Sequence, residues 1–143
     1  MDKKDLETQA AILINLFNSR RFKDTIQKGK ILIKKFPNQL IFYNATALAL
    51  SALGKNEEAL KILKSALNLR PNDIFVLNNL GLIKSNTNQN KQSREYLEKA
   101  ISIYEKKAHL PLKHPTAINI QKYLSATIDL IDVLEKEFDQ IAA

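Results

Sequence analysis

The chain of 143 residues contains no cysteine and no tryptophan, and it has only three glycines and two histidines. Without cysteine it has no disulfides, no thiolate chemistry and no cysteine-ligated zinc site. This favours a reducing compartment, although a bacterial periplasmic protein can also lack cysteine. With so few glycines, no glycine-rich loop is available to bind phosphate. No apolar run is long enough to cross a membrane.

Catalytic chemistry has little support in the residues that are present. His109 and His114 lie in a proline-containing loop and have no carboxylate neighbour at ligand spacing. The acidic residues between positions 129 and 139 fit the polar side of a helix better than a paired-carboxylate site. We therefore expect a non-enzymatic protein without cofactor or metal.

An apolar run at residues 10–17 raises the question of a secretion signal. It follows Lys3 and Lys4, but Asn15 divides it, and Arg20 and Arg21 stand where a small-residue cleavage site would be. We interpret the run as the first helix of the fold and expect a cytoplasmic protein.

The most informative pattern is an internal repeat. Pro37-Asn38 recurs as Pro71-Asn72, a spacing of 34 residues, which is typical of antiparallel helix pairs that stack into a solenoid. The predicted copies are 6–39, 40–73 and 74–107, and the last two align without a gap. They share Asn44 with Asn78, Leu48 with Leu82, Ser51 with Ser85, Asn56 with Asn90, Leu63 with Leu97 and Ala66 with Ala100.

Turn signals divide the middle copy into two helices. Gly54 is expected to stop the first helix and Asn56 to cap the second, which ends before Pro71. Asn72 or Asp73 would then cap the first helix of the next copy. Apolar residues recur at spacings of three and four, which indicates helices throughout.

The middle copy resembles the tetratricopeptide repeat. The residues that carry the resemblance are Tyr43, Ala47, Leu50, Gly54, Ala59, Leu63, Ala66 and Pro71. The third copy supplies Leu77, Leu80, Gly81, Leu97 and Ala100. It has Lys84 where an aromatic is usual, Asn88 for the turn glycine and Glu105 for the proline. The first copy is weakest, because Thr25 and Gly29 stand where alanine and a large apolar residue are usual.

The resemblance implies an all-α fold: a single domain over 1–143, built as an α-solenoid of three hairpins plus a long C-terminal helix. In this family the first helix of each pair lines a concave groove that binds a protein partner, as an extended peptide or a helix. The positions expected to face the groove are Ile14, Phe17, Asn44, Leu48, Ser51, Asn78, Asn79, Leu82 and Ser85.

The asparagines in that set are candidates for peptide contact, because an amide side chain donates and accepts hydrogen bonds at once. The tripeptide Asn79-Leu80-Gly81 is similar to the segment that carries an asparagine ladder in O-GlcNAc transferase and kinesin light chain. Local capping or solvation is the alternative. Co-chaperone members of the family hold a C-terminal carboxylate with cations instead. The matching positions here are Ala10, Ile14, Ala45, Phe75 and Asn79, so that ligand is not expected.

The net charge of +7 is concentrated early in the chain. The basic residues concerned are Arg20, Arg21, Lys23, Lys28, Lys30, Lys34 and Lys35. This segment either binds an anionic partner or is a solvated outer helix face. Nucleic acid is not favoured, because its binders interleave exposed aromatics with the basic residues, and only Phe22 and Phe36 lie nearby.

Beyond residue 107 the repeat ends. Residues 108–114 are expected to form a connector and residues 115–141 a helix longer than a repeat helix, with near-heptad apolar spacing. This helix could cap the last hairpin, cover the groove, or form a homodimer through Ile131, Leu134 and Phe138.

Three functions are therefore compatible with the sequence. The first is a protein-interaction adaptor. The second is an accessory, substrate-positioning module of a larger enzyme system, such as a sulfotransferase or glycosyltransferase. The third is a homo-oligomeric structural element.

Overall fold

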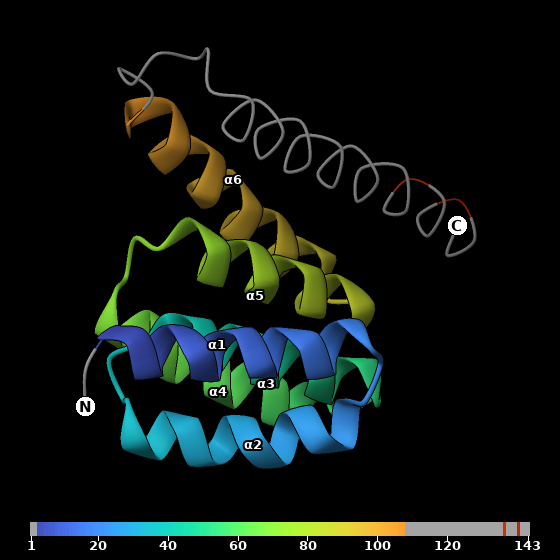
Figure 1. The fold of residues 1–143 in the computed structure, drawn as a ribbon. Coiled ribbons are helices and arrows are strands. Elements are labelled where there is room, and N and C mark those ends of the chain that lie inside the picture. The colour runs from blue at the N-terminus through green and yellow to red at the C-terminus, as the bar shows by residue number, and fades with distance from the viewer. Residues whose placement is uncertain (1–2, 108–135, 137–139, 141–143) are drawn as a thin grey trace. The chain divides into compact units, whose positions relative to one another are not determined.

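The computed structural model describes residues 3–107 and the single residues Lys136 and Gln140. The chain divides into two compact units, Met1–Pro71 and Asn72–Ala143, which are described separately below. Within the described residues every regular element is a helix (Figure 1). The connector expected at 108–114 and nearly all of the helix expected at 115–141 lie outside the described residues, and the single-domain assignment stays a prediction.

The helices follow the predicted period. The first unit contains α1 (Lys3–Asn18), α2 (Phe22–Lys35), α3 (Leu40–Ala52) and α4 (Asn56–Leu69). The second contains α5 (Ile74–Asn86) and α6 (Asn90–Lys107). Because α2, α4 and α6 begin at residues 22, 56 and 90, the 34-residue frame read from the sequence is the frame of the hairpins.

The turn inside each hairpin has the same backbone conformation in all three copies. Arg20, Gly54 and Asn88, each separated from the next by one period, are left-handed, with φ of 61°, 79° and 61°. The following amide then reaches back to close the turn: Arg21 to Leu16, Lys55 to Leu50 and Gln89 to Lys84, at 2.9–3.0 Å. This is the Schellman C-cap, which the sequence indicated only at Gly54.

The helix N-termini confirm one predicted cap and correct another. The Asp73 side chain accepts hydrogen bonds from the backbone N–H groups of Phe75 and Val76, at 3.1 and 3.0 Å, as expected for an N-cap. The prediction for Asn56 is wrong, because Lys55 is the N-cap of α4 and makes no side-chain cap bond. The Oδ1 atom of Asn56 instead accepts a hydrogen bond from the Ser51 hydroxyl at 2.8 Å.

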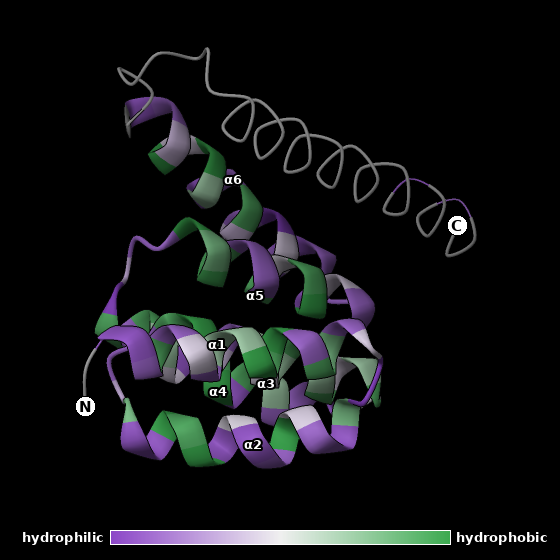
Figure 2. Cartoon of the chain, viewed as in Figure 1, coloured by the Kyte–Doolittle hydropathy of each residue, from purple (hydrophilic) through white to green (hydrophobic). Residues whose placement is uncertain are grey.

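The core of the first unit is built from the facing sides of its helices. Leu13, Leu32 and Phe42 form a buried cluster, to which α1, α2 and α3 each contribute one residue. Further buried side chains on α3 and α4 are Ala47, Ala49, Leu50, Ala59, Leu63 and Ala66. The remaining surface of α2 is mostly polar apart from the exposed Ile31, and Figure 2 shows hydrophilic and hydrophobic residues alternating along the helix. This is the pattern of a helix buried on one side.

In the second unit, α5 packs closely on α6. Ser93 is buried and its hydroxyl donates a hydrogen bond of 2.6 Å to the carbonyl oxygen of Gly81. A Cβ atom on Gly81 would lie 2.6 Å from Leu97, so only glycine allows this approach. Lys84, which replaces the usual aromatic, is buried and its Nζ donates to Gln89 at 2.8 Å. A long aliphatic side chain thus fills the place of a ring.

Candidate peptide-binding face

One face of α3 and one face of α5 have the same order of residue types. On α3 this face contains Ile41, Asn44, Leu48 and Ser51, and on α5 it contains Phe75, Asn78, Leu82 and Ser85. Offsets of three, seven and ten residues place all four on one side of a helix. We call each set an apolar–asparagine stripe. The equivalent positions on α1 include Ala10, Ile14 and Phe17.

In the first unit, the stripe is partly open to solvent. Ile14 and Ile41 are each 40% exposed, and Asn44 and Leu48 are half-buried. Phe17 and Ser51 are among the predicted residues that already have structural partners. The Phe17 ring packs edge-on against Phe22, with centroids 5.6 Å apart, and the Ser51 hydroxyl is bonded to Asn56.

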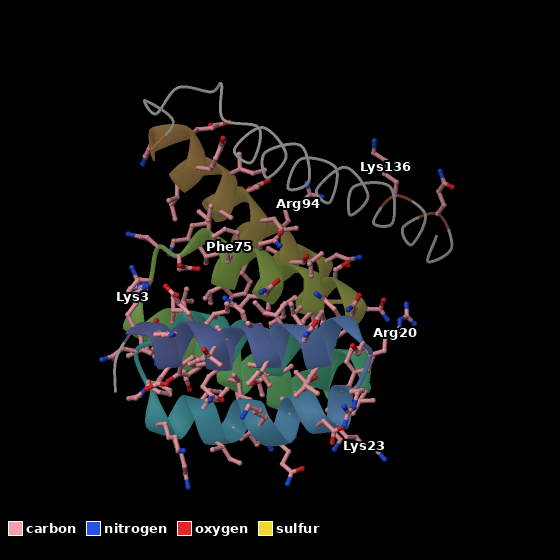
Figure 3. The ribbon with its side chains drawn as sticks, in the orientation of Figure 1. Lys3, Arg20, Lys23, Phe75, Arg94 and Lys136 are labelled. Atoms are coloured by element: carbon pink, nitrogen blue, oxygen red, sulfur yellow. The ribbon has the colours of Figure 1, made fainter. Side chains whose placement is uncertain are left out.

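In the second unit, Phe75 is the most exposed residue of the stripe. It is 55% exposed, at the start of α5 (Figure 3). Asn78, Leu82 and Ser85 are half-buried, and the Oδ1 atom of Asn78 is enclosed without a hydrogen-bond partner among the described residues. Asn79, the residue expected to form the ladder, is only 8% exposed. Asn78 and Phe75 are therefore better placed than Asn79 to contact a ligand.

The groove residues predicted from the sequence do not include Ile41 and Phe75. In the sequence, Phe75 stands out only as a position that matches the carboxylate clamp of co-chaperones. The signal that would have found both is the period itself, since they are 34 residues apart and each lies three residues before a stripe asparagine. Both are large apolar residues with substantial exposure, 40% for Ile41 and 55% for Phe75.

The first helices of the last two repeats expose no ionised side chain. Helix α3 contains no charged residue, and the only one in α5 is the buried Lys84. Such a surface offers apolar contacts and amide hydrogen bonds, and neither a cation for a carboxylate nor an acid–base pair. Within the described part of the chain, no group of three or more histidine or acidic residues could hold a metal ion.

The arrangement defines a class of protein: a helical-hairpin repeat protein, in which the first helices α3 and α5 carry the apolar–asparagine stripes. The chain belongs to the tetratricopeptide-repeat family, because its residues 11–117 match the family described as Psidin, N-terminal TPR repeats region. The predicted family and the all-α solenoid class are thereby confirmed. No curated protein sequence matches the chain.

Several solved structures share the fold. PcrH of Pseudomonas aeruginosa, in complex with the chaperone binding region of PopD, matches with a TM-score of 0.78 at 11% identity, covering 94% of this chain and 96% of PcrH. The type III secretion translocator chaperone SycD of Yersinia enterocolitica has a TM-score of 0.78 at 11% identity, with coverages of 95% and 89%. The Sgt2 TPR domain of Aspergillus fumigatus has a TM-score of 0.65 at 17% identity, with coverages of 86% and 78%. At these identities the likeness is one of fold.

None of the helices in the described ranges combines the length and the apolar character that crossing a bilayer requires.

Proposed function

We propose that this chain is a non-enzymatic, cytoplasmic adaptor that binds an extended, uncharged segment of a protein partner along its apolar–asparagine stripes. The observation that carries the proposal is the recurrence of an exposed apolar residue, an asparagine and a leucine on both α3 and α5. Exposed apolar side chains that recur at equivalent positions do not improve solubility, and they are typical of a surface that binds a partner.

The stripe chemistry suits a peptide backbone. An extended peptide presents one N–H and one C=O per residue, and the side-chain amides of Asn44 and Asn78 are hydrogen-bonding groups of matching kind. Apolar side chains of the peptide would contact Ile41, Leu48 or Phe75, at about 25 cal/mol for each Å² removed from water. The amides would position the segment and the apolar contacts would supply most of the affinity.

Solved structures with this fold support a peptide ligand. PcrH has been crystallised with the chaperone binding regions of PopD and PopB, and SycD with a peptide of the translocator YopD. We transfer to this chain only the use of the fold as a peptide holder. A homodimer through Ile131, Leu134 and Phe138 remains part of the proposal, and one SycD structure is described as an alternative dimer.

The test is a peptide array probed with the full chain, followed by fluorescence polarisation on the peptides selected. We expect uncharged sequences with aliphatic or aromatic residues to be selected. Replacing both asparagines, Asn44→Ala with Asn78→Ala, should weaken binding about tenfold or more, because each lost hydrogen bond contributes about 0.5–1.5 kcal/mol. Phe75→Ser should weaken binding by a similar factor.

Leu69→Ser is the matched control, since Leu69 is 44% exposed but lies at the end of α4, outside the stripes. It should leave the affinity unchanged. Selection of acidic peptides, or equal affinities for the wild type and the stripe variants, would contradict the proposal.

A further inference from the structure

The outer face of α2 carries a row of lysines. Lys23, Gln27, Lys30 and Lys34 follow each other at offsets of four, seven and eleven residues, so they form one ridge along the helix. Eleven residues correspond to about 16 Å of helix. Ile31 lies beside Gln27 and Lys34 on the same surface. These five residues are called the basic ridge below.

The charge of this segment is only partly neutralised. Two carboxylates form ion pairs with residues 20–35: Asp24 lies 2.7 Å from Arg21, and Glu58 of α4 lies 2.6 Å from Lys30. The hydrogen bond from Lys30 lowers the pKa of Glu58, so the Glu58 carboxylate is ionised at neutral pH. Arg20, Lys23, Lys28, Lys34 and Lys35 remain as excess positive charge.

Ile31 does not belong to the core of α2. The residues that α2 buries are Thr25, Gly29 and Leu32, on the opposite side of the helix, whereas Ile31 is 51% exposed. A solvated helix face gains nothing from a large β-branched side chain, and lysine or glutamine would favour the helix slightly more. An exposed isoleucine among lysines is therefore a candidate contact for a partner surface in which an apolar side chain is flanked by acidic residues.

The turn before α2 contains a second energetically unfavourable choice of residue. Arg20 occupies the left-handed turn position at which the next repeat has Gly54. A residue with a Cβ atom is strained there, and arginine has no local hydrogen bond to compensate as asparagine does. Figure 3 shows Arg20 and Lys23 at the end of the hairpin where α1 leads into α2, with side chains projecting away from the helices. The strained position adds positive charge next to the ridge.

Three anionic partners are conceivable, and the structure favours one. Single-stranded RNA would need exposed rings for stacking, but Phe22 and Phe36 are half-buried and packed against Phe17 and Phe42. Insertion of α2 into a lipid surface would need a broad apolar face, and that face of α2 is buried in the core. A protein helix needs only a row of acids and one apolar contact.

We propose that the basic ridge of α2 is a second docking surface, separate from the stripes, which binds an acidic amphipathic helix of a protein partner. Carboxylates on one face of that helix would pair with Lys23 and Lys34, and an apolar side chain between them would cover Ile31. Helices packed side by side match such spacings because both have the same rise per residue.

The experiment uses the full chain and two designed helical peptides with identical glutamates. One peptide has leucines among the glutamates, and the other has glutamines in their place. We expect the leucine peptide to bind more tightly, and Ile31→Ser to abolish the difference between the two. Lys23→Glu combined with Lys34→Glu should weaken both peptides by about tenfold or more.

The matched control is Lys91→Glu with Lys99→Glu on α6, which changes the net charge equally at two exposed positions. It should leave both affinities unchanged, and circular dichroism melts should show that all variants fold. If the control loses as much binding as the α2 variant, the attraction depends on net charge alone and the proposal is overturned. Equal affinity for the two peptides would also overturn the proposal. Tighter binding of poly-uridine RNA or of phosphatidylserine vesicles than of the leucine peptide would overturn it as well.

Discussion

At the scale of single residues, a close approach of α2 and α3 explains a departure from the repeat pattern. Gly29 stands where the family has a large apolar residue, and the sequence alone presented it as a weakness of the first copy. A Cβ atom on Gly29 would overlap the Thr46 hydroxyl oxygen. That hydroxyl is buried and has no hydrogen-bond partner within the described residues. Gly29 and Thr46 thus form a matched pair between α2 and α3.

This pair leads to a prediction about stability. Gly29→Ala should destabilise the protein by about 1–3 kcal/mol through overpacking, although alanine is the better helix former. Adding Thr46→Ala removes the oxygen, leaves the Thr46 Cβ position at 3.1 Å, and should restore most of the loss. Urea unfolding of both single variants and the double variant measures the coupling. A Gly29→Ala variant more stable than the wild type would show that the helices do not approach as described.

At the scale of elements, the hairpin turns have one geometry and three different residues. The backbone demands φ near +60° in each, and glycine, asparagine and arginine meet that demand at increasing cost. The sequence predicted the turn at Gly54 because glycine is its usual residue. It did not predict the same turn at Arg20, since arginine carries no such signal and only the register of the hairpins shows the equivalence.

The turn geometry predicts that Arg20→Gly stabilises the first hairpin. Relief of the left-handed strain should gain about 0.5–1 kcal/mol after the greater freedom of glycine in the unfolded chain is counted. Gly54→Ala should lose about as much, and it tests strain alone because nothing lies within 4 Å of the added Cβ. Thermal melts of the two variants should shift in opposite directions. A lower melting temperature for Arg20→Gly would mean that the arginine side chain stabilises the turn by a contact of its own.

At the scale of the whole molecule, two kinds of surface are separated onto different helices. First helices α3 and α5 expose apolar and amide groups, whereas the second helix α2 exposes lysines. An apolar peptide and an acidic helix would therefore not compete for the same residues. The basic net charge of the chain also favours fast association with acidic partners at low salt.

Self-association is the prediction that belongs to the whole molecule, and it rests on the sequence alone. If Ile131, Leu134 and Phe138 join two copies, light scattering should give twice the mass of the chain at high concentration. Leu134→Glu should then give a soluble, equally helical monomer, because a carboxylate is costly in an apolar interface. Lys136→Glu, which adds a carboxylate at an exposed position nearby, should remain dimeric.

Two outcomes would contradict this prediction. A wild-type chain that stays monomeric at high concentration removes the dimer. A Leu134→Glu variant that melts earlier with unchanged mass would instead indicate that the segment caps the repeats.

The sequence by itself determined the helical class, the 34-residue period and the position of every hairpin in the described residues. These follow from features that act locally, namely apolar spacing, glycine and proline at turns, and Asp73 at a helix start. Part of each stripe could also be predicted from the sequence, since Asn44 recurs as Asn78 and Leu48 as Leu82, one period apart.

Only the tertiary structure decided which of these side chains are available. The Ser51 hydroxyl is hydrogen-bonded to Asn56, and the Phe17 ring packs against Phe22. Asn79 is buried, whereas Phe75 and Ile31 are exposed to solvent. Availability depends on neighbours that come from other helices, and a repeat pattern assigns the same environment to equivalent residues in every copy. The physical reason is that burial and hydrogen-bond partners belong to the packing between elements, which periodicity along the chain does not encode.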